Sequence, residues 1–144
     1  MKTHKNVFEK IYSVKNLIRA FKEASGGKRY KKSVLVFKEN LVENIKKIRE
    51  ELKNKSYKHG EYLFFSVRDP KERKISAAPF RDRVIHHAIY QVINPIFDKK
   101  FIFDSFANRN KKGTHNAVKR LQQFLRKIQR ERERVLSNIK SGIG

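Results

Sequence analysis

Apolar residues recur every three or four positions over four stretches of this 144-residue chain. This spacing predicts amphipathic helices over residues 7–24, 34–54, 81–96 and, from near Thr114, through residue 128. The first stretch ends at Ser25-Gly26-Gly27, and glycine is the residue that most readily follows a helix end. The third stretch carries the widest apolar band, so we expect it to be the most buried helix, ended or kinked at Pro95.

Two short runs between the second and third helices have the composition of β-strands. Residues 61–67 are rich in aromatic residues, residues 74–78 form a second run, and Asp69-Pro70 predicts a tight turn between them. The expected product is a β-hairpin. Its tip presents four basic residues suited to binding phosphates, namely Arg68, Lys71, Arg73 and Lys74. The predicted fold class is therefore α+β and mostly helical, with four helices and one β-hairpin.

The segment between Asp98 and His115 has no periodicity. It combines a patch of phenylalanines with a following run of polar and basic residues, and loops attached to a core cluster commonly bear functional groups. Ten basic and only two acidic residues lie from Arg109 to Arg134. We therefore expect one face of the fourth helix to join a core and the other to bind a polyanion.

The net charge of the chain indicates which class of partner it binds. Lysine and arginine number 36 against 14 acidic residues, a formal net charge of +22. Such an excess opposes a compact state unless a polyanion neutralises it, which makes nucleic acid the expected partner. The basic residues are spread over several elements rather than along one amphipathic anchor, so we expect no membrane partner. The N-terminus has no signal-peptide core and the chain has no cysteine, which is consistent with a cytoplasmic protein.

Few residues have the spacing of a metal site. His86 and His87 are adjacent, so they point to different sides of a helix and do not share a metal as an i, i+4 pair can. With no cysteine present, we expect no metal site. Asp82 lies in the first turn of the third predicted helix, where we interpret it as a local cap or a partner of a neighbouring arginine.

Five spaced sequence blocks within residues 67–117 carry a resemblance to a known family. The chain resembles, roughly from Phe8 to Lys127, the opening part of the reverse transcriptases of group II introns, retrons and, most closely, diversity-generating retroelements. Those enzymes read approximately P-K-x-x-R, P-F-R-D-R-V, P-I-F, D-S-[YF]-A-x-R and G-x-G-T-H. The blocks here are Pro70 to Arg73, Pro79 to Val84, Pro95 to Phe97, Asp104 to Arg109, and Lys111 to His115.

The resemblance implies a division of the chain. Residues 1–6 are expected to form a loose N-terminus and residues 7–134 a region like the fingers of a reverse transcriptase. Residues 135–144 are expected to be the start of a palm strand, degenerate or truncated, with the rest of the palm missing.

The resemblance also identifies what the sequence lacks. Reverse transcriptases clamp two divalent metals with aspartates, the first in a strand reading approximately L-K-x-D-I and the others in a Tyr-x-Asp-Asp turn. Either Asn138 or Gly142 stands at the first position, and no aspartate follows Asp104. We therefore expect no catalytic residue and no cofactor in this chain, with Mg²⁺ bound only where a complete palm is present. Whether the chain takes part in an enzyme is left open.

The resemblance assigns roles to particular basic and polar residues. Lys71 and Arg73 match the family's fingers residues that hold the triphosphate of the incoming deoxynucleotide, and a point charge and a planar fork suit phosphate oxygens. Lys111 stands where the family has the leading glycine of its last block. The predicted nucleic-acid contacts are Arg68, Lys74, Ser105, Asn108, Arg109, Lys111, Lys112, His115, Lys119 and Arg120.

The implied function is that of the N-terminal part of an RNA-directed DNA polymerase from a retroelement. Its partners would be an RNA template with its cDNA primer, the remaining reverse-transcriptase domains, or a retroelement accessory protein. The alternative is a stand-alone basic RNA-binding protein without enzymatic activity.

Overall fold

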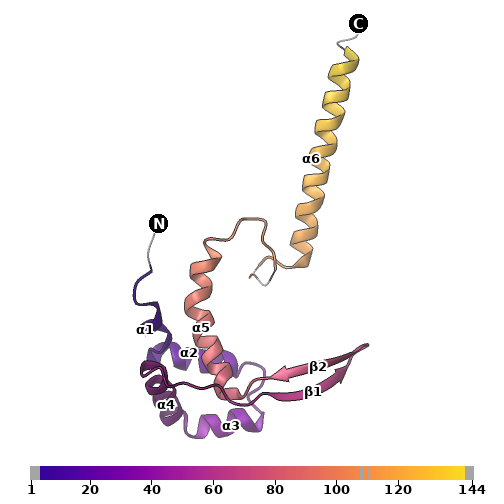
Figure 1. Ribbon diagram of the computed structural model, residues 1–144. Helices are drawn as coiled ribbons and strands as arrows, with labels where there is room; N and C mark the ends of the chain where they lie inside the picture. The colour runs from indigo at the N-terminus through magenta and orange to yellow at the C-terminus, as the bar shows by residue number, and fades with distance from the viewer. Residues whose placement is uncertain (1–3, 108, 110, 142–144) are drawn as a thin grey trace. The chain divides into compact units, whose positions relative to one another are not determined.

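A computed structural model describes residues 4–107, 109 and 111–141, and its elements are labelled in Figure 1. Within these residues the chain forms six helices and one two-stranded sheet, so the α+β, mostly helical class is confirmed. The chain divides after Phe97 into two compact units, and each is described by itself. The elements are α1 (Val7–Ile11), α2 (Val14–Ala24), α3 (Lys32–Glu39), α4 (Leu41–Lys53), β1 (Leu63–Arg68), β2 (Glu72–Ala77), α5 (Phe80–Asp98) and α6 (Thr114–Ser141).

The core of the first unit is built around three phenylalanines from three helices. Phe21 of α2 stacks on Phe37 of α3, with ring centroids 5.7 Å apart. Phe80 of α5 meets both rings edge-on, at 6.1 Å from Phe21 and 5.3 Å from Phe37. Such aromatic pairs contribute about 1 kcal/mol each beyond the area they bury. The rest of the core consists of the buried Ile11, Leu17, Ala20, Ala24, Val34, Ile45, Ile48, Leu52, Val84, Ile85 and Ala88.

The first expected helix is divided into α1 and α2. Ser13 has an extended backbone, its hydroxyl donates to the carbonyl of Lys10 at 2.9 Å, and it accepts from the amide of Asn16 at 3.4 Å. This is the geometry of a serine N-cap, which starts a new helix. Asn16 then donates its side-chain amide to the carbonyls of Ile11 and Ala88, each at 3.0 Å, and so ties α1 to α5. At the far end of α2, Gly27 has φ of 66°, which confirms the predicted glycine stop.

The second expected helix is also divided, into α3 and α4. Asn40 lies between them with φ of −112° and ψ of 41°, outside the helical region. The side chain of Asn44 donates to the carbonyl of Phe37 at 3.0 Å and satisfies one of the acceptors left free at the end of α3. Apolar spacing continues across the break, so periodicity alone did not reveal it.

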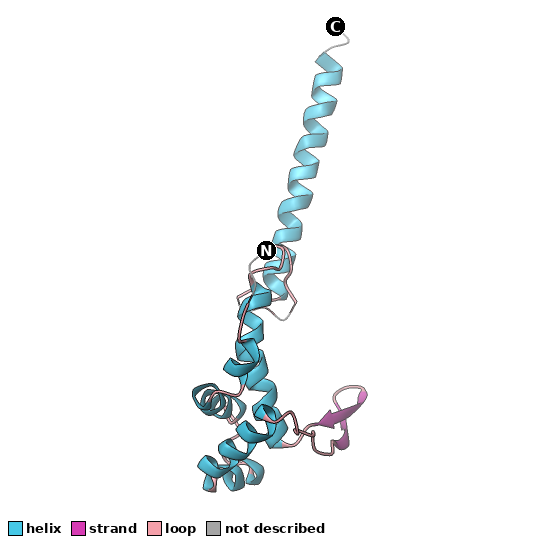
Figure 2. Ribbon diagram, turned by 60° about the vertical axis from the view of Figure 1, so that its left-hand side comes forward, coloured by secondary structure: helices cyan, strands magenta, loops and turns pink. Residues whose placement is uncertain are grey.

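The predicted hairpin is confirmed, with β1 and β2 paired antiparallel from Leu63 opposite Ala77 to Arg68 opposite Glu72. It projects from the helices of the first unit (Figures 1 and 2). Every residue of both strands is exposed except Ala77, which is partly buried.

The structure refines one expectation about the last helices and corrects another. α5 has five buried residues, more than any other described helix, but all lie in its first half; Pro95 is inside the helix, which ends three residues later at Asp98. In the second unit, α6 continues to Ser141, so residues 135–141 are helical and do not begin a palm strand. Their apolar positions continue the three-and-four spacing of the preceding turns, which favours a helix. Residues 142–144, including Gly142, lie outside the described residues, as do residues 1–3 of the expected loose N-terminus.

Among the residues that the structure describes, no helix is both long enough and apolar enough to cross a bilayer.

Candidate nucleic-acid interface

The block Pro79 to Val84 holds the base of the hairpin to the helices of the first unit. Asp82 is 1% exposed. It accepts from the hydroxyl of Tyr57 at 3.0 Å and from the amide of Gly60 at 2.7 Å, both in the segment that leads into β1. A Cβ at Gly60 would lie 3.0 Å from Cγ of Pro79, so any other residue here would force Pro79 to shift by a few tenths of an ångström. Asp82 is therefore a structural anchor, and the interpretation as a local cap or a partner of a neighbouring arginine was wrong.

Burial and the Asp82 carboxylate together act on Tyr57. Removal from water, the hydrogen bond to Asp82 and the negative charge of Asp82, in this order of size, together raise the pKa of the Tyr57 phenol to about 12, against a smaller lowering by Arg81. The phenol therefore stays protonated and remains a hydrogen-bond donor to Asp82 throughout the neutral range.

The two arginines beside Asp82 are also structural. Arg81 forms an ion pair with Glu51 of α4, and its guanidinium lies over the ring of Tyr57, 5.5 Å from the centroid. Arg83 donates to the carbonyl of Ala24 at the end of α2, at 3.4 Å. Basic residues near a helix C-terminus satisfy its free carbonyls and its partial negative charge. Neither arginine is among the predicted nucleic-acid contacts, and both side chains bind groups within the first unit.

The strand register divides the basic residues of the hairpin between its two faces. Successive side chains of a strand point to opposite faces. Arg73 lies opposite Val67 and shares its face with Leu63, Phe65 and Ile75, whereas Arg68 and Lys74 lie on the other face with Ser66 and Ser76. One face is thus apolar with a single cation near the tip, and the other is polar except for the exposed Phe64.

Lys71 lies in the turn between the strands, where its carbonyl accepts from the amide of Asp69 at 3.2 Å. Within the part of the chain that the structure describes, no ion pair involves Lys71 or Arg73. Their charges are exposed and available to an anionic ligand. Lys74 and Arg68 are exposed as well, but Arg68 pairs in register with the acidic Glu72.

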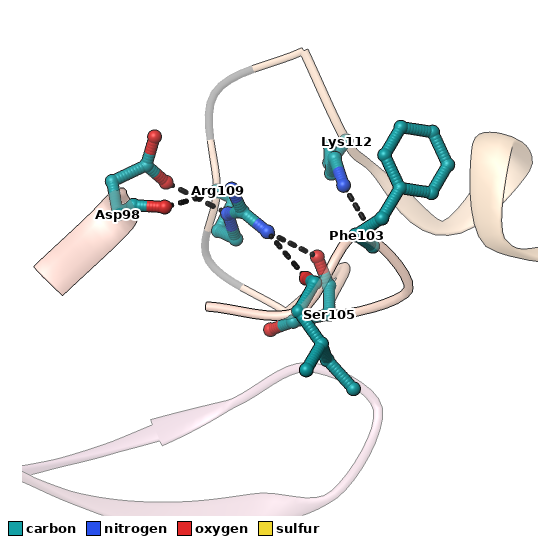
Figure 3. Close-up of polar contacts among 6 residues, drawn as sticks. Asp98, Phe103, Ser105, Arg109 and Lys112 are labelled. Atoms are coloured by element: carbon teal, nitrogen blue, oxygen red, sulfur yellow. Dashed lines mark hydrogen bonds and ion pairs between the residues drawn. The ribbon is translucent and has the colours of Figure 1, made fainter. Parts of the chain in front are cut away.

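In the second unit, Arg109 organises the loop that precedes α6 (Figure 3). Its Nε donates to the Asp98 carboxylate at 2.7 Å and its Nη2 to the Asp98 carbonyl at 3.2 Å. Its Nη1 donates to the carbonyls of Ile102 and Ser105, both at 3.1 Å. The side chain is 13% exposed. Arg109 therefore fixes the conformation of the loop, and Ser105 contributes its backbone carbonyl as one of the acceptors.

Phenylalanine rings surround two further cations, Lys112 of the same loop and Arg120 in the second turn of α6. The Lys112 ammonium donates to the carbonyl of Phe103 and lies 4.0 Å from the centroid of that ring and 5.1 Å from that of Phe106. Arg120 donates to Asp104 at 2.8 Å and lies over the rings of Phe103 and Phe124. Cation–π contacts of this kind contribute about 0.5–2 kcal/mol each. Lys112 and Arg120 thus stabilise the loop and keep only part of their charge accessible.

Lys111, which stands where the family that the chain resembles has a glycine, has a backbone conformation that glycine adopts most readily. Its φ is 63°, in the left-handed region, and its carbonyl accepts from the Asn116 side chain at 2.9 Å. The next helix begins at Thr114, after Gly113, whose carbonyl accepts from the amides of Asn116 and Ala117. The loop therefore keeps a glycine-like turn despite the lysine, with its side chain exposed.

We expect Lys111→Gly to stabilise the second unit. A non-glycine residue in the left-handed region costs about 1–2 kcal/mol, and glycine removes this cost. Glycine also loses more conformational entropy on folding, which offsets part of the gain. The expected gain is about 1 kcal/mol in the free energy of unfolding, measured by urea denaturation followed by circular dichroism. Lys111→Ala is the matched control, because it removes the same charge and keeps the strain. Equal stability of the two variants would contradict the assignment.

The remaining predicted contacts are exposed. His115 and Lys119 lie at the start of α6 with exposed side chains, whereas Asn108 lies outside the described residues. Sequence reasoning did not identify the other exposed cations of α6 as contacts. Arg126 and Arg130 follow Lys119 by seven and eleven residues, which places all three on one side of a helix. This set is called the basic stripe of α6, and its spacing in the sequence was a usable signal.

Among the described residues no three histidine, aspartate or glutamate side chains come together as a possible metal site.

No protein-family model matches the chain. Over 96 residues it is 25% identical to a protein named nuclear intron maturase 2, mitochondrial, from Arabidopsis thaliana. The alignment covers 56% of this chain and only 13% of that relative. The similarity to an intron maturase points in the same direction as the resemblance to group II intron reverse transcriptases. It does not distinguish among the retroelement classes.

Proposed function

We propose that this chain forms the fingers, and the segment leading into the palm, of a reverse transcriptase of the kind found in group II introns and related retroelements. In this role it binds an RNA template with its cDNA primer and receives the incoming deoxynucleotide. Its protein partners are then the remaining domains of the enzyme or a retroelement accessory protein.

The observation that carries this proposal is the order of the five sequence blocks, and the similarity to an intron maturase supports it. In the structure, four of the five blocks lie in the hairpin with its base and in the loop before α6. The first forms the tip of the hairpin and the second anchors its base through Asp82. The fourth and fifth form the loop that Arg109 holds in shape. A polymerase needs rigid supports for such loops, because phosphates must be held in a fixed position during transfer.

Lys71 and Arg73 are the proposed nucleotide contacts. Both are exposed at the tip of the hairpin. A lysine ammonium and an arginine fork form strong, charge-assisted hydrogen bonds with phosphate oxygens. Arg68 and Lys74, on the polar face, are the proposed contacts to the nucleic-acid backbone. In the second unit that role falls to Lys111, His115, Lys119 and the exposed parts of Lys112 and Arg120, while Arg109 positions the loop.

Phosphoryl transfer itself is assigned to residues outside this sequence. The aspartates that hold Mg²⁺ in the reverse transcriptases that the chain resembles have no counterpart in this sequence. In this proposal the chain binds and orients its ligands, and no step through a metal is derived for it.

The test joins this chain to a palm that carries the Tyr-x-Asp-Asp turn and measures deoxynucleotide incorporation on an RNA template. Lys71→Ala with Arg73→Ala should reduce incorporation at least about 100-fold, because each charge-assisted hydrogen bond contributes roughly 1.5–3 kcal/mol. RNA affinity should change little.

The matched control is Arg68→Ala with Lys74→Ala, which removes the same charge from the other face of the same hairpin. It should weaken RNA binding and leave the KM for the deoxynucleotide near that of the parent protein. Normal incorporation by the Lys71/Arg73 variant would contradict the nucleotide assignment.

A stand-alone RNA-binding protein is the second candidate function. The basic stripe of α6 favours it, because exposed cations on a helix bind an RNA backbone without the help of a polymerase. The DNA that follows this reading frame distinguishes the two candidates. A continuation that encodes a Tyr-x-Asp-Asp turn, in frame or after a frameshift, supports the polymerase, and unrelated sequence supports the RNA-binding protein.

A further inference from the structure

Six of the nine apolar residues in α6 fall on a seven-residue repeat. The positions of this repeat alternate at intervals of three and four over three heptads, with Arg132 at the one polar position, and the apolar Phe124 and Leu136 lie beside them. A straight helix drifts by about 20° per heptad relative to such a repeat, so a sustained 3.5-residue period is typical of a helix that pairs with another helix. The seam, as these positions are called below, consists of Val118, Leu121, Leu125, Ile128, Arg132, Val135 and Ile139.

Nothing covers the seam within the described part of the second unit. Every described side chain from Leu121 to Ile139 is exposed, and the apolar members of the seam are 48–61% exposed. A helix with an apolar stripe is stabilised mainly by packing that stripe, and isolated helices are marginal in water. The seam therefore requires a partner.

The residues beside the seam indicate what kind of partner fits. In a two-helix coiled coil the flanking positions face the partner, and like charges there oppose pairing. Of the seven flanking residues only Glu131 is charged. The basic stripe of α6 lies on the opposite side of the helix, away from the seam. The flanking residues are Ala117, Gln122, Phe124, Gln129, Glu131, Leu136 and Asn138.

This arrangement permits a second copy of the same helix as the partner. When two copies meet at the seam, their lysines and arginines point outward and no pair of cations is opposed at the flanking positions. Arg132 is the exception, since it lies on the seam itself. In a parallel, in-register pair, the flanking Glu131 of one helix borders Arg132 of the other, so each arginine meets a carboxylate across the interface.

We propose that α6 pairs with α6 of a second copy of this chain as a parallel, in-register, two-stranded coiled coil over residues 118–139. Arg132 weakens the pair and fixes its register, as single polar residues in such seams do. The outward basic stripes stay free, so the proposal does not rest on the proposed polymerase function. Its failure would leave that function untouched.

The test measures the mass of the full chain by sedimentation at rising concentration and at high salt, where the repulsion between two strongly basic copies is screened. We expect a monomer–dimer equilibrium. Leu125→Gln with Ile128→Gln should raise the dissociation constant at least about 100-fold, because it removes four apolar side chains from the interface. The control, Lys127→Gln with Arg130→Gln, changes two residues away from the seam and should keep the dimer.

A variant that strengthens the pair distinguishes a loss of pairing from a loss of folding. Arg132→Leu completes the apolar seam and should tighten association at least about tenfold, while helical content measured by circular dichroism stays the same or rises. Orientation is tested with Val118→Cys, since the chain has no cysteine of its own. A parallel pair places the two new thiols together, so oxidation should give a covalent dimer.

Three results would overturn the proposal. They are a monomer at all concentrations for both the parent chain and Arg132→Leu, a dimer that survives the Leu125/Ile128 change, and a Val118→Cys dimer that does not cross-link. The first result would exclude a second copy as the partner, the second would place the dimer interface away from the seam, and the third would exclude the parallel orientation.

Discussion

Asp82→Ala is expected to lower the free energy of unfolding of the first unit by about 4 kcal/mol. The carboxylate is 1% exposed and accepts from the Tyr57 hydroxyl and the Gly60 amide. Alanine leaves both donors buried without an acceptor, at about 1–3 kcal/mol each, and leaves a cavity beside Pro79. Domains of this size are stable by only about 5–15 kcal/mol, so the unit should approach unfolding.

Urea denaturation of the full chain, followed by circular dichroism, measures this loss. Glu39→Ala removes an exposed carboxylate from the end of α3 and should change stability by less than about 0.5 kcal/mol. Asp82→Asn keeps one acceptor oxygen and should fall between the two. If Asp82→Ala were no more harmful than Glu39→Ala, Asp82 would not anchor the hairpin.

The pH dependence of stability provides an independent readout of the same contact. Burial and Asp82 raise the pKa of Tyr57 to about 12, above the value of about 10 for an unfolded tyrosine. Because the folded pKa is raised, the contribution of Tyr57 is present below pH 10 and is lost as the pH rises towards 12. The loss should be absent in Tyr57→Phe. In Asp82→Asn the pKa of Tyr57, followed by tyrosinate absorbance, should move down towards 10.

RNA affinity is expected to fall about 100-fold between roughly 50 and 200 mM salt. Each phosphate neutralised by a lysine or arginine releases bound counterions, and about five contacts give a fall of this size. The net charge of +22 and the exposed cations of α6 provide these contacts. The measurement is a titration of a labelled structured RNA at several salt concentrations. An affinity that stays constant over this range would exclude binding through phosphates.

Changing the basic stripe locates the interaction. Lys119→Gln, Arg126→Gln and Arg130→Gln together should reduce the slope of log affinity against log salt by about 2–3, close to one unit for each lost contact. Lys46→Gln, Lys47→Gln and Arg49→Gln remove the same charge from the exposed face of α4 and provide the control. Equal effects of the two triple variants would indicate a diffuse electrostatic attraction without a defined surface.

The local patterns of the sequence determined the elements of this protein. Apolar spacing located every helix, aromatic composition located the hairpin, and Gly27 ended α2 as predicted, because each of these depends on residues within a few positions of one another. The breaks at Ser13 and Asn40 were missed, since a capping side chain can end or start a helix without interrupting the apolar spacing. The charge, likewise, was fixed by composition alone.

Only the tertiary structure decided what the individual polar residues do. Asp82 binds groups 22 and 25 residues away, and no spacing rule connects them. Arg109 was predicted as a nucleic-acid contact on the resemblance, yet its hydrogen bonds hold the loop, because the turn brings three backbone carbonyls and Asp98 around it. The separation of Arg73 from Arg68 and Lys74 depends on the strand register. Pairwise contacts between distant residues are absent from a linear pattern and arise only when the chain folds.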